Sequence, residues 1–478
     1  MEYVLNVLRG AYVKMPSPMK NFLSVGLSLL PPEWLYGRTY RNQRSLISKS
    51  QSDTTFVRAY QESMLNKLLT LCVQSSPYYR DAMRNVMEES SMQGPFCLED
   101  LQKLPIIHKD IVRQHCREMF VTKEGKLDKV STSGSSGVPL EIFLDKDRSV
   151  KEWSYIQQCW STIGYRPEEK RAVLRGFFIN RAHTQPWEYD SGLRELRFSP
   201  FHMTEDNMKL YLELIDKHRI QYIHGYPSAI FQLANYALKA RWNPVLPIKG
   251  IFPISEPLYS HQRDLIATSF QNPRIVSYYG MSEKVAFAIE DVENPGVYEF
   301  EPTYGYVELV DGAGNQITEI GRRGTIVATG FLSIGMPLLR YDTGDMAELV
   351  VASSQDNCYR LRVKSISSRW GQEYVVGKEG ELISMTALNV HSSAYAYIKT
   401  FQLFQERPGE VIVKVVSIKG AASKDIASLA EEFEKKTSGS IRFATQECDA
   451  IEQNTRGKSR FVEQKLKLDE AAVCMSAE

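Results

Sequence analysis

The sequence predicts an α/β protein with a large N-terminal part of layered helices and sheets and a smaller C-terminal part. From residue 140 onward, short β-branched runs alternate with longer runs of helical periodicity, which is the pattern of an α/β fold. Past residue 298, strand-like runs crowd together with turn residues between them, which indicates an antiparallel β region. From residue 411 a further strand, helix and strand follow, which indicates a separate α+β unit.

The individual elements follow from the same periodicities. A packed helix is expected over 57–74, where apolar residues recur at helical spacing and a Ser-Ser-Pro sequence follows. Strands are expected at 172–174, 251–254 and 275–279, helices at 208–217 and 229–240, and antiparallel strands at 306–310 and 325–329. The C-terminal unit is expected to contain a strand at 411–416, a charged helix at 421–436 and a strand from 441. We therefore predict two domains, 1–366 and 367–478.

Composition excludes several classes of protein. With 478 residues and 43% hydrophobic side chains, about two to four folding units are expected. Lys and Arg total 58 against 57 Asp and Glu, so no basic surplus favours nucleic acid as a partner. The seven cysteines form no C-x-x-C pair, which is typical of reduced thiols in a cytoplasmic protein. We expect no transmembrane segment; the apolar stretch 22–30 fits a buried helix or a contact with a membrane surface.

Several familiar catalytic motifs are absent. Gly457-Lys458-Ser459 imitates the end of a Walker A loop, but Glu452 stands where the first glycine is required. The sequence contains no H-E-x-x-H, G-x-S-x-G or G-x-G-x-x-G motif, and its eight histidines are scattered. These absences argue against a zinc protease, an α/β-hydrolase and a Rossmann dehydrogenase.

A loop rich in hydroxyls and glycines lies between two expected strands. Its central residues are Thr132, Ser133, Gly134, Ser135, Ser136 and Gly137. Glycine lets backbone N–H groups approach phosphate oxygens closely, and the hydroxyls donate further hydrogen bonds. The loop therefore fits a polyphosphate site, although a flexible hairpin loop explains the same residues.

Three further motifs follow in order along the chain. In Tyr278-Tyr279-Gly280-Met281-Ser282-Glu283 an aromatic face precedes a carboxylate able to hold a divalent cation. In Tyr341-Asp342-Thr343-Gly344-Asp345 a turn presents a carboxylate that can accept both hydroxyls of a ribose. In Thr455-Arg456-Gly457-Lys458 a glycine turn presents a lysine as a counter-charge. Each motif by itself also occurs as a strand end, a surface turn or a solvated basic patch.

In this order the four motifs resemble those of the adenylate-forming superfamily of acyl-CoA synthetases and adenylation domains. Within it the chain is similar to the phenylacetate-CoA ligase and CapK branch, the latter associated with capsular polysaccharide biosynthesis. Gly225-Tyr226-Pro227-Ser228 and Ser255-Glu256-Pro257-Leu258 are features of that branch. The resemblance implies a large N-terminal domain that carries a small, mobile α+β lid.

The resemblance also implies roles for individual residues. The loop from Thr132 to Gly137 would hold the β- and γ-phosphates of ATP. Tyr279 and Gly280 would lie at the adenine, Ser282 would touch the α-phosphate and Glu283 would help to coordinate Mg²⁺. Asp345 would bind the ribose, Arg369 would contact ribose or phosphate, and Lys458 would bridge the carboxylate and the α-phosphate.

The acid substrate is expected near Gly225, Tyr226, Ser255 and Glu256. His224 would help to close this pocket, although a hydrogen-bonded structural histidine is the simpler interpretation. The segment 171–203 is rich in arginine and aromatic residues, which fits a pocket for an anionic or sugar-bearing substrate, structural salt bridges or an ordinary surface. Two departures from the family pattern occur, at Ser368-Arg369-Trp370-Gly371-Gln372 and at Glu452-Gln453-Asn454-Thr455.

The function implied is that of an ATP-dependent ligase. It would activate a carboxylic acid as acyl-AMP, release pyrophosphate, and pass the acyl group to coenzyme A or to an amine on a sugar or amino acid. Such a ligase could act in capsular or surface polysaccharide biosynthesis. The alternative is a nucleotide-binding protein that keeps the fold without turnover, which the altered junction residues suggest.

Overall fold

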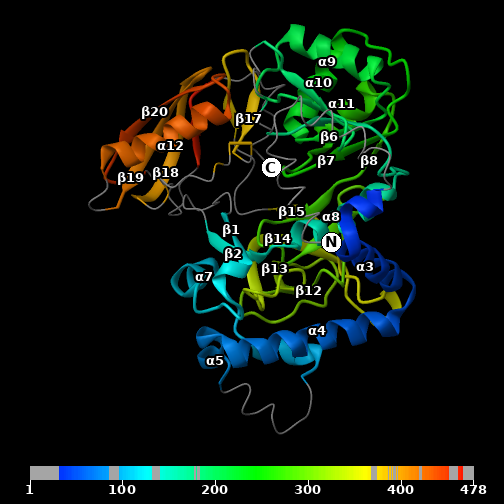
Figure 1. Ribbon diagram of the computed structural model, residues 1–478, viewed down its shortest axis with the longest axis vertical. Helices are drawn as coiled ribbons and strands as arrows, with labels where there is room; N and C mark the ends of the chain where they lie inside the picture. The colour runs from blue at the N-terminus through cyan, green and yellow to red at the C-terminus, as the bar shows by residue number, and fades with distance from the viewer. Residues whose placement is uncertain are drawn as a thin grey trace.

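The structure is a computed structural model of the whole chain. It describes residues 32–84, 96–131, 140–176, 179, 184–367, 374–385, 387–388, 390, 395, 397–418, 422–451 and 461–466. Its elements form three groups, shown in Figure 1: helices over a large antiparallel sheet, a second sheet covered by helices, and a separate C-terminal unit. No helix in these ranges is long and apolar enough to cross a membrane.

N-terminal helices cover the antiparallel sheet, and α4 runs along it in Figure 1. Asp53 caps α4 by accepting a hydrogen bond from the backbone N–H of Phe56 at 2.9 Å, and the helix predicted at 57–74 is confirmed. The elements of this first group are α3 (Pro32–Ser52), α4 (Thr54–Ser75), α5 (Pro77–Ala82), η1 (Leu98–Lys103), α7 (Lys109–His115), η2 (Glu124–Lys126), β1 (Leu127–Ser131), β2 (Glu141–Asp145) and α8 (Arg148–Ser161).

The second sheet has the order β4-β5-β3-β6-β7-β8 within the described residues. Its strands pair in parallel except at the edge strand β4, and the connections from β5 to β6, from β6 to β7 and from β7 to β8 contain α9, α10 and α11, respectively. The elements are β3 (Arg171–Leu174), β4 (Trp187–Asp190), β5 (Glu195–Phe198), α9 (Glu205–Lys217), β6 (Tyr222–Gly225), α10 (Pro227–Lys239), β7 (Gly250–Pro253), α11 (Ser260–Ser269) and β8 (Arg274–Ile275).

The large antiparallel sheet has the order β12-β13-β14-β15-β11-β10-β9 in the described part of the chain. The antiparallel region predicted after residue 298 is confirmed by this pairing. Its elements are β9 (Tyr278–Gly280), β10 (Phe287–Glu290), β11 (Val297–Phe300), β12 (Gly305–Val310), β13 (Arg323–Gly330), β14 (Tyr341–Val351), η3 (Gln355–Asn357) and β15 (Arg362–Ser367).

The strand predicted at 275–279 is wrong as a single element. The chain leaves the parallel sheet after β8 and enters the antiparallel sheet at β9, because Ser277 is held between them. Its backbone N–H and its hydroxyl both donate to one carboxylate oxygen of Glu290, at 2.9 and 2.8 Å. This crossing places the residues after β9 at the junction of the two sheets.

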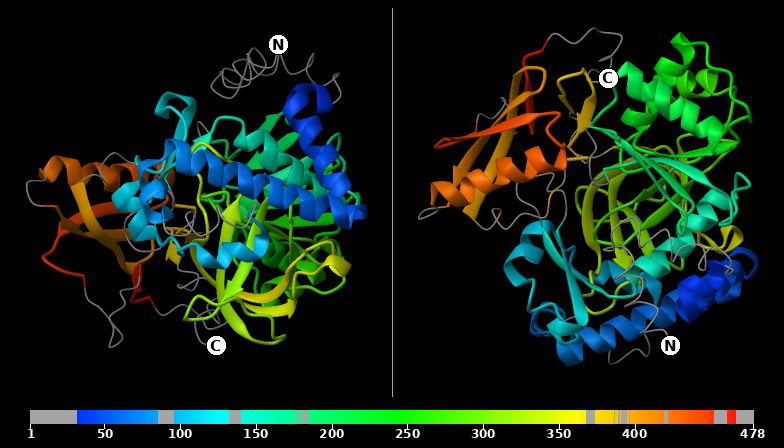
Figure 2. Two further views of the ribbon diagram at one scale, coloured as in Figure 1. Left: turned by 90° about the horizontal axis from the view of Figure 1, so that it is seen from below. Right: turned by 45° about the horizontal axis from the view of Figure 1, so that its top comes forward.

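The C-terminal unit is a sheet of order β20-β19-β18-β21 with α12 against one face, drawn in orange and red in Figure 2. The hairpin of β16 and β17 precedes it. The smaller α+β unit predicted from the sequence is confirmed, while the domain limits 1–366 and 367–478 stay a prediction. The elements are β16 (Tyr374–Val376), β17 (Leu382–Ser384), β18 (Ile398–Arg407), β19 (Glu410–Ser417), α12 (Ser423–Lys436), β20 (Arg442–Glu447) and β21 (Val462–Gln464).

Candidate functional site

The parallel strands β3, β6 and β7 end side by side at one edge of their sheet. Leu174 pairs with Gly225, and Gly225 pairs with Pro253, so the loops that follow these strands are neighbours. In open α/β sheets, ligands bind at this carboxyl edge. The predicted substrate residues Tyr226 and Ser255 follow two of these strands directly, so the fold brings them together.

Backbone packing explains two of the residue choices at this edge. A Cβ atom added to Gly225 would lie 2.4 Å from the carbonyl oxygen of Leu174, so only glycine fits there. Ser255 has a φ of 67°, a left-handed conformation that costs a serine free energy. Strain of this kind concentrates at functional sites, and it lies at the predicted acid pocket.

Glu256 has a defined structural role at the start of α10. Its two carboxylate oxygens accept hydrogen bonds from the backbone N–H and the hydroxyl of Ser228, at 3.1 and 3.2 Å. A carboxylate at a helix N-terminus also interacts favourably with the helix dipole. Glu256 therefore orients the Gly225-Tyr226 loop, and its predicted contact with substrate stays a prediction.

His224 is buried at this edge, with 4% of its surface exposed. Its ring lies 4.8 Å from that of Trp160, and neither ring nitrogen has a hydrogen-bond partner in the described part of the chain. Burial and the positive charges of Arg175 and Arg171 hold its pKa well below the ordinary value, so the imidazole is neutral. Neither nitrogen of this buried ring is hydrogen-bonded within the described residues, so the hydrogen-bonded structural histidine considered above is not observed there.

The second and third motifs meet through two hydrogen bonds. The hydroxyl of Tyr279 donates to Asp345 at 2.8 Å, and the hydroxyl of Tyr341 donates to Glu283 at 2.8 Å. The first pair is 66 residues apart in sequence and the second 58. Each carboxylate keeps one oxygen that accepts no hydrogen bond from the described residues, so each has an acceptor left for a ligand.

The sequence predicted a turn before Asp345, but residues 341–345 lie in β14, at a point where its pairing with β13 shifts register. Hydrogen bonds from backbone N–H groups to side chains hold this irregular segment. Asp342 accepts a hydrogen bond from the backbone N–H of Gly344 at 2.8 Å, and the hydroxyl of Thr343 accepts one from the N–H of Asp345 at 3.1 Å. Gly344 has a φ of 81°, which glycine adopts without strain. The second oxygen of Asp342 lies 2.9 Å from the Nδ1 atom of His108. These hydrogen bonds hold this irregular segment of β14 in one conformation and so orient Asp345.

Burial affects the ionisation of Asp345. It raises the pKa of this carboxyl from the ordinary 3.8 to about 6, while the hydrogen bond from Tyr279 and the charge of Lys109 act in the opposite direction. A ligand hydroxyl that donates to the free oxygen would favour the charged form. The site is thus suited to a neutral hydrogen-bond donor at Asp345, such as a ribose hydroxyl.

Ser282 and Glu283 lie in a turn after β9, next to Gly280. Glu283 is buried, with 7% of its surface exposed, whereas Ser282 is partly exposed. No cluster of three or more metal-ligating side chains occurs in the described residues. One carboxylate with a free oxygen fits Mg²⁺, which proteins often bind through one or two carboxylates together with substrate phosphates.

Some predicted site residues lie outside the described residues. β1 ends at Ser131 and β2 begins at Glu141, and the two strands pair with each other, so the predicted phosphate loop connects a hairpin. The predicted residues outside the described ranges are Thr132, Ser133, Gly134, Ser135, Ser136, Gly137, Arg369 and Lys458.

Sequence reasoning missed two residues of the site. Tyr341 belongs to a motif that we quoted, but its hydrogen bond to Glu283 was not expected. His108 lies 234 residues before Asp342, and no sequence signal connects the two. Only the backbone explains their contact, because Ile107 forms a parallel bridge with Tyr341 and its carbonyl accepts from the N–H of Asp342 at 2.9 Å.

The arginine-rich segment proves to be largely structural. Arg171 donates to Glu195 at 2.5 Å, and Arg197 contacts Glu195 at 2.7 Å and Asp190 at 3.2 Å. These side chains are buried together, so each charge needs its partner. The salt-bridge interpretation therefore holds for Arg171 and Arg197.

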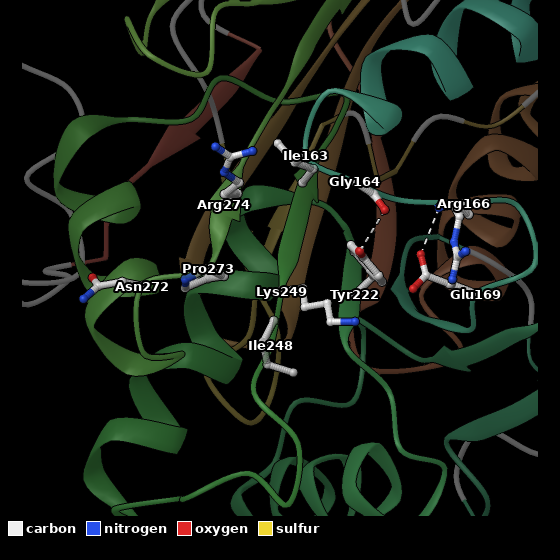
Figure 3. Close-up of a pocket in the computed structure, with 10 residues that line it drawn as sticks. All are labelled: Ile163, Gly164, Arg166, Glu169, Tyr222, Ile248, Lys249, Asn272, Pro273 and Arg274. Carbon is white, nitrogen blue, oxygen red and sulfur yellow. Dashed lines mark hydrogen bonds between the residues drawn. The ribbon is translucent and has the colours of Figure 1, made fainter.

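A hollow of about 500 Å³ lies away from the candidate site. Figure 3 shows the residues that line it. Tyr222 and Arg274, which begin β6 and β8, and Lys249, which precedes β7, help to line it. It therefore lies at the amino edge of the parallel strands, opposite the candidate site. Its cationic side chains Arg166 and Arg274 stand on different sides of the hollow.

Comparison with known proteins agrees with the geometry. Residues 375–465 match the family model of the CapK C-terminal domain. The chain is 25% identical over 409 residues to Protein CapK of Staphylococcus aureus, which covers 82% of this chain and 86% of that protein. It is 23% identical over 347 residues to a phenylacetate-coenzyme A ligase of Thermus thermophilus, covering 70% and 73%.

Solved structures share the fold. Crystal structures of 2-hydroxyisobutyryl-CoA ligase match with a TM-score of 0.54 for the complex with 2-HIB-AMP and CoA, covering 87% of this chain and 91% of that chain at 16% identity. The postadenylation complex with R3-HIB-AMP gives 0.51, also at 16% identity, over 89% and 93%. The predicted fold class and enzyme class are confirmed by these relatives taken together. The chain is thus similar to Protein CapK and to phenylacetate-coenzyme A ligases, it has the fold of 2-hydroxyisobutyryl-CoA ligase, and its residues 375–465 match the model of the CapK C-terminal domain.

Proposed function

We propose that this protein activates a carboxylic acid with ATP, releasing pyrophosphate, and transfers the acyl group to coenzyme A or to an amine. The observation that carries the proposal is the pair of hydrogen bonds from Tyr279 to Asp345 and from Tyr341 to Glu283. They join two nucleotide motifs and leave one free carboxylate oxygen in each. The relatives support the reaction class, because one is named a phenylacetate-coenzyme A ligase and a neighbour holds an acyl-AMP and CoA.

The chemistry requires activation because a carboxylate is a poor acyl donor. The acid oxygen attacks the α-phosphorus of ATP, the bond to the pyrophosphate oxygen breaks, and an acyl-adenylate forms. The acceptor thiol or amine then attacks the acyl carbon, loses its proton, and AMP leaves. Mg²⁺, when bound, offsets the charge of the phosphates and activates the α-phosphorus towards attack.

Each predicted site residue would have its own role in this reaction. Glu283 would hold Mg²⁺, Ser282 would donate to the α-phosphate, and Asp345 would accept from the ribose. The Tyr279 ring, fixed through its hydroxyl, would lie on the adenine with Gly280 beside it. Lys458, Arg369 and the loop from Thr132 to Gly137 would contact the phosphates.

The acid would lie at the carboxyl edge of the parallel sheet. Gly225, Tyr226, Ser255 and His224 would form its walls, with Glu256 fixing the loop. A cytoplasmic setting and a role in capsular or surface polysaccharide biosynthesis would suit a CapK-like ligase, with a sugar or amino acid amine as acceptor.

A pyrophosphate-release assay tests the proposal. The full chain is given MgATP and a panel of carboxylic acids that includes arylacetic acids, uronic acids and amino acids. Acid-dependent release of pyrophosphate, with the acyl-adenylate detected by mass spectrometry, is the expected result. If MgATP binds but no acid of a broad panel releases pyrophosphate, the non-catalytic nucleotide-binding alternative is favoured instead.

Asp345→Asn is expected to weaken ATP binding by about tenfold or more, as loss of a charge-assisted hydrogen bond predicts. Its effect on stability depends on pH. Because burial raises the pKa of Asp345 from 3.8 to about 6, the favourable contribution of the protonated carboxyl is complete below 3.8 and is lost as pH rises through 6. The variant should therefore unfold about 2 to 4 °C higher than the wild type at pH 8.

Calorimetric titration with MgATP and thermal unfolding at pH 5 and pH 8 measure both effects. The stability difference should shrink towards pH 5. The matched control is Asp356→Asn, at an exposed aspartate in η3, which should change neither quantity. Unchanged ATP affinity in Asp345→Asn would remove this residue from the nucleotide site.

We also propose that the region after residue 366 moves as a body between the two half-reactions, since they need different groups near the α-phosphate. Labels at the exposed positions Glu213 on α9 and Glu431 on α12 report the distance. That distance should change when a non-hydrolysable acyl-adenylate analogue or an acceptor is added. An identical distance distribution in all samples contradicts a moving lid.

A further inference from the structure

Lys284 follows Glu283, the proposed Mg²⁺ ligand, and closes the turn in which Glu283 lies. Its backbone N–H donates to the carbonyl oxygen of Met281 at 3.2 Å. Lys284 has a φ of 59°, a left-handed conformation that costs a lysine free energy. Such a conformation persists only where the surrounding structure holds it, so contacts beyond the turn must fix Lys284.

The side chains of Glu283 and Lys284 are held by two different elements. The hydroxyl of Tyr341 on β14 donates to Glu283 at 2.8 Å. The ammonium group of Lys284 forms an ion pair with Glu152 on α8 at 2.8 Å, and it makes no other ion pair or hydrogen bond in the described part of the chain. The turn is therefore held from two sides, by β14 at Glu283 and by α8 at the next residue.

The helix α8 is a firm support for Glu152. Tyr155, one helical turn further on, is fully buried, and its hydroxyl donates to the hydroxyl of Thr303 at 3.1 Å. Its ring meets the ring of Tyr304 edge-on, with 5.0 Å between the centroids, and the hydroxyl of Tyr304 lies 3.5 Å from Glu152. Thr303 and Tyr304 directly precede β12, so Glu152 is anchored to the antiparallel sheet.

Close packing fixes the chain on the far side of the turn. A Cβ atom on Gly305 would lie 2.2 Å from the carbonyl oxygen of Val285, and one on Gly330 would lie 2.9 Å from the Cα atom of Val285. On the near side, β9 is paired with β10. What the ion pair of Lys284 adds is the orientation of the turn between these two supports.

We propose that Lys284 and Glu152 are positioning residues, whose ion pair orients the turn so that the free carboxylate oxygen of Glu283 can bind Mg²⁺. This rests on the part of the proposed function that assigns Mg²⁺ to Glu283, and it does not require turnover. The two side chains are 22% and 15% exposed, so salt and solvent weaken their attraction less than that of an exposed pair. Groups that orient a metal ligand without touching the metal are typically worth about 10 to 100-fold in metal affinity.

The magnesium dependence of ATP binding tests the proposal without catalysis. Calorimetry on the full chain gives the affinity for ATP in saturating Mg²⁺ and in EDTA, and the ratio of the two is the gain from Mg²⁺. We expect Lys284→Met and Glu152→Gln each to lower this gain by about tenfold. Lys284→Arg should keep most of it, because a guanidinium also pairs with a carboxylate.

The two variants also separate positioning from a simple effect of charge. Lys284→Met removes a positive charge and Glu152→Gln a negative one, so a charge that acts on the phosphates at a distance would change the gain in opposite directions. Positioning lowers the gain in both. Because the pair acts through Glu283, Lys284→Met should cause no further change in a Glu283→Gln background.

The matched control is Lys364→Met, which breaks another lysine–glutamate pair of the antiparallel sheet, that of Lys364 on β15 with Glu348 on β14 at 3.0 Å. It should leave the gain from Mg²⁺ unchanged. A lower gain in Lys364→Met as large as in Lys284→Met would mean that any weakened pair of this sheet has the effect, and the specific role of Lys284 would be wrong.

The outcomes distinguish this proposal from the proposed function. If the wild type gains affinity from Mg²⁺ and Lys284→Met keeps that gain, the positioning role is wrong and the proposed function is untouched. If the wild type binds ATP equally well in Mg²⁺ and in EDTA, the assignment of Mg²⁺ to Glu283 is wrong, and the positioning role with it. A gain lowered in both variants supports the positioning role even if no acid releases pyrophosphate.

Discussion

Replacing Lys458 by alanine is expected to reduce acyl-adenylate formation by about 10² to 10³-fold, the scale of losing one preorganised charge-stabilising group. In the sequence, Lys458 precedes the buried Phe461 and the strand β21, which pairs in parallel with β18. Gly457 allows a tight turn before the lysine. Mass-spectrometric detection of acyl-AMP in single-turnover mixtures measures the effect.

The same variant should still transfer an acyl group from ready-made acyl-adenylate, because the charge is needed only where pyrophosphate departs. The control is Lys465→Ala, which removes a surface lysine paired with Glu463 at 2.9 Å and should leave both steps unchanged. If Lys458→Ala forms the acyl-adenylate at the wild-type rate, the role in adenylation that the resemblance implies for Lys458 is wrong, and the non-catalytic alternative is favoured.

Replacing Arg340 by methionine is expected to lower the free energy of unfolding by about 3 to 5 kcal/mol, the cost of leaving a buried charge without its partner. Arg340 forms a two-pronged ion pair with Glu308 in which both N···O distances are 3.0 Å, and the two residues are 2% and 1% exposed. Its remaining N–H groups donate to the carbonyl oxygens of Gln102, Leu104 and Gly314. It thus ties the end of η1 to β12 and to the turn at Gly314, directly before the start of β14.

The loss of stability caused by Arg340→Met should increase with pH. Burial raises the pKa of Glu308, and the positive charge of Arg340 opposes this rise. Without Arg340 the pKa of Glu308 rises further, so the carboxyl stays protonated to higher pH. A carboxyl whose pKa is higher in the folded than in the unfolded protein makes its full contribution to stability at low pH, and this contribution is lost as the pH rises through the folded-state pKa. Urea unfolding at pH 5 and pH 8 measures this.

The matched control for Arg340 is Arg322→Met, at an exposed arginine 3.7 Å from Asp311, where a loss of at most about 1 kcal/mol is expected. The double variant with Glu308→Leu should recover part of the stability, since the unpaired charge is gone. If Arg340→Met and Arg322→Met lower the free energy of unfolding by equal, small amounts, the prediction that the buried ion pair of Arg340 and Glu308 stabilises the fold is wrong.

Local patterns were enough to predict several of the elements. The helix α4 was expected over 57–74 because apolar residues recur there at helical spacing before a Ser-Ser-Pro sequence, whereas its start at Thr54 with Asp53 as the cap was not predicted. The antiparallel strands after residue 298 were expected from their turn residues. The run at 275–279 failed, because whether a chain changes sheets depends on Glu290 binding Ser277, which no local pattern reports.

For the candidate site, the sequence determined the residue types and their order, because each nucleotide motif is a short segment whose chemistry can be read locally. Only the tertiary structure decided which groups meet. Tyr341 reaches Glu283, and Lys436 reaches Gly176 across 260 residues, because strand pairing and domain contact place them there. It also decided ionisation, since the neutral state of His224 and the raised pKa of Asp345 come from burial, a property of the folded chain and not of the residues in order.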